Sequence, residues 1–72
     1  MELVINQVYD LSGWIFDDYA LKSNNNKFVY VGSHTEEGTE VAAFRGLENN
    51  LEQWATHETL MEDEDVNCRA VL

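Results

Sequence analysis

The sequence predicts a small two-layer α+β domain in which an antiparallel sheet carries one or two helices on one face. Strand-like segments alternate along the chain with segments of helical periodicity. The chain has 72 residues, of which 44% are hydrophobic, and it contains no proline and no internal repeat. This length and composition suit one folded core, so we expect a single domain over residues 1–72.

The N-terminal third contains one strand and one ambiguous segment. Residues 2–9 carry apolar side chains on both faces, as is typical of a central strand, and residues 10–13 end it. Residues 13–22 permit a helix with Ser12 as its N-cap, or a strand that pairs with residues 27–32 across an asparagine turn. We favour the helix, but the residues leave both interpretations open.

The middle of the chain predicts a β-hairpin. Residues 27–31 are rich in β-branched and aromatic side chains and end at Gly32, which is the clearest strand pattern in the sequence. Residues 33–39 are expected to form a polar loop with Gly38 as the turn residue. Residues 40–45 return as the second strand, with alternate side chains on opposite faces.

The C-terminal third predicts a second helix and a last strand. Apolar residues recur at helical spacing over residues 47–57, and this stripe assigns Trp54 to the core. Residues 59–65 are expected to form an acidic loop, and residues 66–72 alternate as a strand. The resulting order is β-α-β-β-α-β, which is ferredoxin-like. The alternative is a β-meander with a single helix over residues 47–57.

Acidic residues dominate the charge. The chain has 14 acids and 4 bases, for a net charge of −10, and residues 37–72 alone carry −7. Between Glu48 and Asp65 there are seven acids and no lysine or arginine. Such a field repels nucleic acid and anionic membranes, and it attracts a basic protein surface. The alternative is that the charge serves only solubility.

Motifs for catalysis and metal binding are weak, so we expect no enzymatic activity, no metal and no cofactor. His34 and His57 do not have zinc-site spacing. Ser33 shows no histidine partner along the sequence, and the lone Cys68 is typical of a small core residue. The longest apolar run is too short to span a membrane, and the N-terminus does not read as a secretory signal. A cytoplasmic location is therefore expected.

The candidate partner-binding residues are acidic, with one aromatic anchor. On the helix expected over residues 47–57, Glu48 and Glu52 lie one turn apart, about 6 Å, which is of the same order as the spacing of phosphates along a nucleic-acid strand. An exposed Trp14 beside acids would suit a basic partner, and the alternative is that Trp14 closes one end of the core. The full set is Trp14, Asp17, Asp18, Glu48, Glu52, Glu58, Glu62, Asp63, Glu64 and Asp65.

These residues support one functional hypothesis and one alternative of a different class. The hypothesis is a small acidic inhibitor that blocks the basic nucleic-acid-binding surface of a partner protein by charge mimicry. By analogy of size and charge, such proteins are made by bacteriophages against host defence or transcription, anti-CRISPR-like inhibitors among them. Such a protein would act in the host cytoplasm. The alternative is a generic interaction module or homodimeric subunit.

Overall fold

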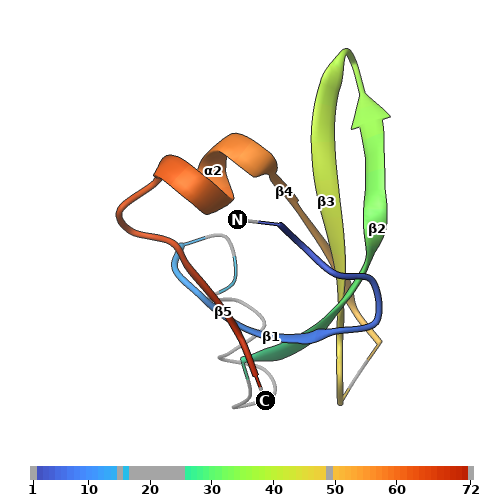
Figure 1. Ribbon diagram of the computed structural model, residues 1–72, viewed down its shortest axis with the longest axis vertical. Helices are drawn as coiled ribbons and strands as arrows, with labels where there is room; N and C mark the ends of the chain where they lie inside the picture. The colour runs from blue at the N-terminus through green and yellow to red at the C-terminus, as the bar shows by residue number, and fades with distance from the viewer. Residues whose placement is uncertain (1, 15, 17–25, 49, 72) are drawn as a thin grey trace.

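The structure is a five-stranded antiparallel sheet with one short helix, seen in a computed structural model that describes residues 2–14, 16, 26–48 and 50–71 (Figure 1). The elements are β1 (Val8–Ser12), β2 (Lys27–Glu36), β3 (Thr39–Gly46), β4 (Glu52–Thr56), α2 (His57–Glu62) and β5 (Asn67–Ala70). The strand order is β4-β3-β2-β1-β5, so four consecutive strands form a meander and the last returns to pair with β1. The predicted α+β class is confirmed, whereas the ferredoxin-like order is not confirmed.

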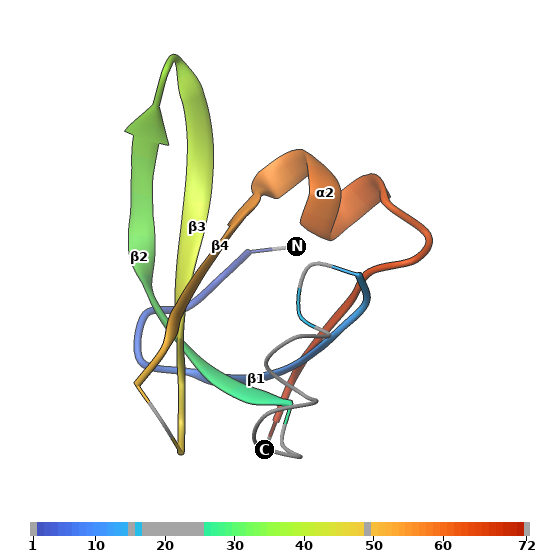
Figure 2. The ribbon, with the colours of Figure 1, turned by 180° about the vertical axis from the view of Figure 1, so that it is seen from behind.

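The sheet bends along β2 and encloses the core. β1 pairs only with the start of β2, from Lys27 to Val29, whereas β3 pairs with β2 from Phe28 to Glu36, with a register shift between Tyr30 and Gly32. In both ribbon views β1 crosses the direction of β3, and α2 lies between the ends of β4 and β5 (Figures 1 and 2). The buried cluster inside this bend is Tyr9, Leu11, Phe16, Phe28, Tyr30, Ala42, Phe44, Ala55, Leu60 and Val66. The Phe44 ring is central, with the ring centroids of Tyr30 and Tyr9 5.5 and 6.2 Å away.

The predicted hairpin is confirmed, and its strands are longer than expected. Most of the segment expected as a polar loop, residues 33–39, continues the two strands, and that part of the prediction is wrong. Only Glu37 and Gly38 form the turn, with φ of 50° and 82°, as a two-residue turn of the primed type requires. Because this end of the hairpin is largely exposed on both faces, its strands carry no apolar alternation that would have revealed them.

The first strand lies later in the chain than predicted. It covers Val8–Ser12 rather than residues 2–9, because Tyr9 and Leu11 face the core while Asp10 faces outward. The Asp10 carboxylate forms an ion pair of 2.8 Å with the ammonium group of Lys27 on β2, so its polar side chain does not interrupt the strand. The ambiguous segment 13–22 lies outside the described residues except at Gly13, Trp14 and Phe16. The predicted last strand is confirmed in its central part, as β5.

The helix predicted over residues 47–57 is wrong. Residues 52–56 form β4, which pairs with β3 from Val41 to Arg45, and a helix starts only at His57. Ala55 faces the core from β4, whereas Trp54 points to the other side and is 49% exposed, so its assignment to the core is also wrong. The same apolar residues fit a helical stripe locally, but pairing with β3 satisfies the backbone of residues 52–56.

The segment expected as an acidic loop begins with helix α2. Thr56 is the N-cap, and its hydroxyl accepts a hydrogen bond of 3.1 Å from the backbone N–H of Thr59. Leu60 anchors the helix in the core, and the helix ends at Glu62. A helix of six residues is too short to show a helical period, and for this reason the sequence pattern did not reveal α2.

Candidate functional site

Helix α2 and the turn that follows it carry a continuous acidic segment, residues 58–65. Glu58 and Glu62 lie four residues apart on α2, so they point to the same side. Together with Thr59 and Asp63 they line an open hollow of about 260 Å³. Glu64 and Asp65 continue the exposed negative charge into the turn. The one-turn spacing of carboxylates that the sequence assigned to Glu48 and Glu52 therefore occurs on α2 instead.

Glu48 and Glu52 do not belong to this acidic segment. Glu48 follows β3, and Glu52 begins β4, so both lie toward the end of β4 opposite to α2. The Oε1 atom of Glu52 accepts a hydrogen bond of 2.6 Å from the indole N–H of Trp54. The predicted helical track from Glu48 to Glu52 is wrong, because these residues are not helical.

Trp14 lies beside the acidic segment, and its hydrogen-bond partner there, Asp63, is 49 residues away in the sequence. Its indole N–H donates a hydrogen bond of 2.9 Å to Oδ2 of Asp63, and its side chain remains 61% exposed. The Oδ1 atom of the same carboxylate accepts a hydrogen bond from the backbone N–H of Asp65. The indole donor, and secondly the Asp65 donor, hold the pKa of Asp63 below its ordinary value.

This arrangement decides between the two interpretations of Trp14. An exposure of 61% does not fit a residue that closes the core, and the hydrogen bond to Asp63 fixes the ring at the surface. Asp17 and Asp18, the acids expected to flank Trp14, lie outside the described residues. Among the described residues, the acid that contacts Trp14 is Asp63, from the far end of the chain, and no local sequence signal indicates this proximity.

The described basic side chains lie on the opposite side of the molecule. Residues paired across antiparallel strands share a face, and Lys27, Asp10 and Arg69 are consecutive partners across β2, β1 and β5. Their neighbours Phe28, Tyr9 and Leu11 face the core, so this row is on the outer face of the sheet. Arg45 occupies the outer face of β3 by the same argument. Helix α2 packs on the inner side, which separates the acidic segment from these cations.

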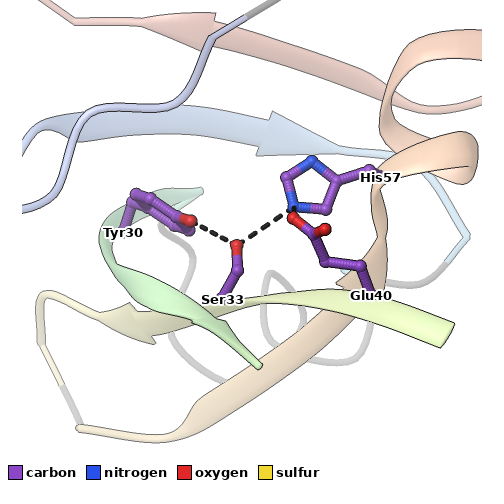
Figure 3. Close-up of polar contacts among 4 residues, drawn as sticks. All are labelled: Tyr30, Ser33, Glu40 and His57. Atoms are coloured by element: carbon purple, nitrogen blue, oxygen red, sulfur yellow. Dashed lines mark hydrogen bonds and ion pairs between the residues drawn. The ribbon is translucent and has the colours of Figure 1, made fainter. Parts of the chain in front are cut away.

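A second polar cluster joins the hairpin to the start of α2 (Figure 3). The Oγ atom of Ser33 lies 3.0 Å from Nε2 of His57 and also hydrogen-bonds to the Tyr30 hydroxyl. The Glu40 carboxylate lies 3.2 Å from the same Nε2 atom. The sequence shows no histidine partner for Ser33 and does not exclude one, and the structure supplies His57, because the fold brings together residues 24 positions apart.

The geometry of this cluster suits anchoring rather than nucleophilic catalysis. In a serine–histidine–carboxylate triad, Nε2 accepts the serine proton while the carboxylate binds the other ring nitrogen. Here the Glu40 carboxylate and Ser33 both lie at Nε2, so a proton on Nε2 is held between the two oxygens. His57 therefore ties the first residue of α2 to β2 and β3.

Neither a reactive cysteine nor a metal cluster is found in the part of the chain that the structure describes. Burial raises the pKa of the Cys68 thiol to about 11, so the reactive thiolate is scarce near neutral pH. Among residues 2–14, 16, 26–48 and 50–71, no three histidine, cysteine or acidic side chains are placed to share a metal ion. None of the helices in these ranges is both long and apolar enough to cross a membrane.

Comparison with known proteins found no relative of this chain. No family model matches the chain. A search of curated proteins and a search of solved structures also gave no match.

Proposed function

We propose that this protein is a small acidic, non-enzymatic inhibitor that docks on the basic nucleic-acid-binding surface of a partner protein and blocks it. The contact surface consists of Trp14 and the acidic segment, residues 58–65. The observation that carries the proposal is the hydrogen bond from Trp14 to Asp63, because it fixes an exposed aromatic ring among carboxylates. Exposed tryptophans are frequent anchors of protein interfaces.

The charges around Trp14 determine the kind of partner. From Gly46 to Cys68 the sequence contains no lysine or arginine, so nothing within this stretch neutralises the acidic segment. Carboxylates presented in this way suit arginine and lysine side chains, with which they form charge-assisted hydrogen bonds. Glu58 and Glu62, about 6 Å apart on α2, imitate neighbouring phosphates of one strand. The same charge repels nucleic acid itself.

The biological setting follows by analogy of size and charge alone. A small acidic protein that blocks a nucleic-acid-binding surface suits a bacteriophage product directed against host defence or transcription, including an anti-CRISPR-like role. It would then act in the cytoplasm of the host cell.

The proposal is tested by capturing partners from nuclease-treated host lysate on the immobilised protein. We expect one basic nucleic-acid-binding protein, which is released by high salt and by an added DNA or RNA duplex. The double variant Glu58→Gln/Glu62→Gln and the variant Trp14→Ala should each lose this protein. The matched control Glu37→Gln/Glu48→Gln removes the same charge from the hairpin tip and from the turn after β3, and it should retain the partner.

Two outcomes would contradict the proposal. If both double variants lose the partner equally, net charge rather than this surface is responsible. If the captured protein survives high salt and is indifferent to nucleic acid, the alternative of a generic interaction module is favoured, with an apolar contact surface. A concentration series in sedimentation then tests whether that partner is a second copy of the chain.

A further inference from the structure

A second aromatic surface lies on the outer face of the sheet, away from the acidic segment. Gly32, Ala43 and Trp54 are consecutive partners across β2, β3 and β4, so they lie side by side on this face. His34 and Val41 form the next pair, and the ring centroid of His34 lies 4.5 Å from that of Trp54, nearly perpendicular to it. The indole therefore reaches across β3 to meet a side chain of β2.

The position of the Trp54 ring across β3 explains the burial of two small residues on the outer face. Ala43 and Val41 are only 4% and 7% exposed, although the core lies on the other side of β3. Trp54 remains 49% exposed, so part of its ring covers the sheet and part faces solvent. Beside it, the position of Gly32 is open, because a Cβ atom there would meet no atom within 4 Å.

The indole is also held in place by a carboxylate. The Trp54 N–H donates to Oε1 of Glu52 at 2.6 Å, although the residue opposite Glu52 on β3 is Arg45. Glu36, at the far end of the same face, lies 3.3 Å from Nε2 of His34. The exposed indole face is held by the Glu52 carboxylate, and the Glu36 carboxylate lies beyond His34 on the same face. Such a ring attracts a cation through its face and through the neighbouring negative charge together.

We propose that Trp54 and Glu52 form a binding site for an arginine side chain of an extended, basic partner segment. The guanidinium group stacks on the exposed indole face, and Glu52 supplies the opposite charge at the ring edge. The open position at Gly32 leaves room on the sheet for the backbone of the segment. Arg45 is the nearest basic residue in register, and it opposes an incoming cation.

This site is separate from the proposed docking surface around Trp14, and one experiment reports on both. The chain has two tryptophans, so a nitrogen–proton correlation spectrum shows two indole N–H signals. The variants Trp14→Phe and Trp54→Phe assign them. A capped hexa-arginine peptide is then titrated into the protein, with a capped hexa-serine peptide as the neutral control.

We expect hexa-arginine to shift the Trp54 signal in a saturable way, and hexa-serine to leave it unmoved. Trp54→Leu should weaken binding at this site, followed at the His34 resonances, about two- to fivefold, as expected for an exposed cation–π contact. Glu52→Gln should weaken it as well, and Arg45→Gln should strengthen it. The Glu58→Gln/Glu62→Gln variant removes charge from the other surface and should leave the Trp54 shift in place.

Three results would overturn the inference. One is a Trp54 signal that stays fixed while the Trp14 signal moves, which would leave the docking surface around Trp14 intact. Another is an equal response to hexa-serine. The third is a stronger response to an oligothymidylate than to hexa-arginine, because the outer face would then bind nucleic acid through Arg45, Lys27 and Arg69.

Discussion

Replacing Gly13 with alanine should destabilise the protein strongly, because β1 ends there against the backbone of the acidic segment. A Cβ atom on Gly13 would lie 2.3 Å from the carbonyl oxygen of Asp65 and 2.8 Å from Cα of Val66. Both are backbone atoms, so no side-chain rotation relieves the overlap. The φ of Gly13 is +123°, a conformation that alanine rarely adopts.

The magnitude follows from these two costs. The unfavourable φ costs about 1–3 kcal/mol. Relieving the overlap moves Val66 out of the core, and a buried valine side chain contributes about 1.5–3 kcal/mol. The sum is about 2.5–6 kcal/mol, against a total stability of roughly 4–11 kcal/mol for a domain of this length. A loss of about 3 kcal/mol lowers Tm by roughly 12–24 °C.

Gly32→Ala is the matched control for this measurement. Gly32 has nearly the same φ, +128°, but a Cβ atom there meets open space, so only the conformational cost applies. Urea denaturation followed by circular dichroism gives the free energy of unfolding of both variants. We expect Gly13→Ala to lose at least about 1.5 kcal/mol more than Gly32→Ala, the lower bound of the valine burial term. Equal losses would refute the reasoning that the close approach of Gly13 to residues 65–66 is decisive.

Two further predictions concern α2 and β5. Thr56→Ala removes the N-cap of α2 and should lower the free energy of unfolding by about 1 kcal/mol, whereas Thr56→Ser keeps the hydroxyl and should cost less; identical urea midpoints for the two variants would argue against the cap. The Cys68 thiol, with its pKa raised from 9.0 to about 11, should be alkylated by iodoacetamide much more slowly in the folded protein than in urea at pH 8. The raised pKa means that the folded state favours the neutral thiol. The contribution of Cys68 to the free energy of unfolding is therefore complete below pH 9, and it is lost as the pH rises toward 11. Equal alkylation rates with and without urea would contradict the burial of Cys68.

The hairpin could be predicted from the sequence because its pattern is local. Residues 27–31 are β-branched and aromatic, and Gly38 supplies the positive φ that the turn requires. The alternation of residues 41–44 was predicted, although the structure buries both of its faces. The second face is covered by Trp54 from β4, which local alternation does not reveal.

The error over residues 47–57 has a physical cause. Leu47, Leu51, Trp54 and Ala55 recur at helical spacing, but both leucines are exposed in the structure. Periodicity measures which side chains could share a face, and it does not measure whether a neighbouring strand is available. The exposed edge of β3 offered backbone hydrogen bonds to residues 52–56, and the helix was limited to the stretch after Thr56.

The sequence by itself determined the charge, the single acidic run and the strands whose side chains alternate strongly, because these properties depend on residues close together in the chain. Only the tertiary structure decided that Trp14 lies against Asp63, that His57 meets Ser33, and that Trp54 faces outward beside His34. Each of these contacts joins residues 20 or more positions apart. They depend on the bend along β2 and on the pairing of β4 with β3, which come from the packing of the whole chain.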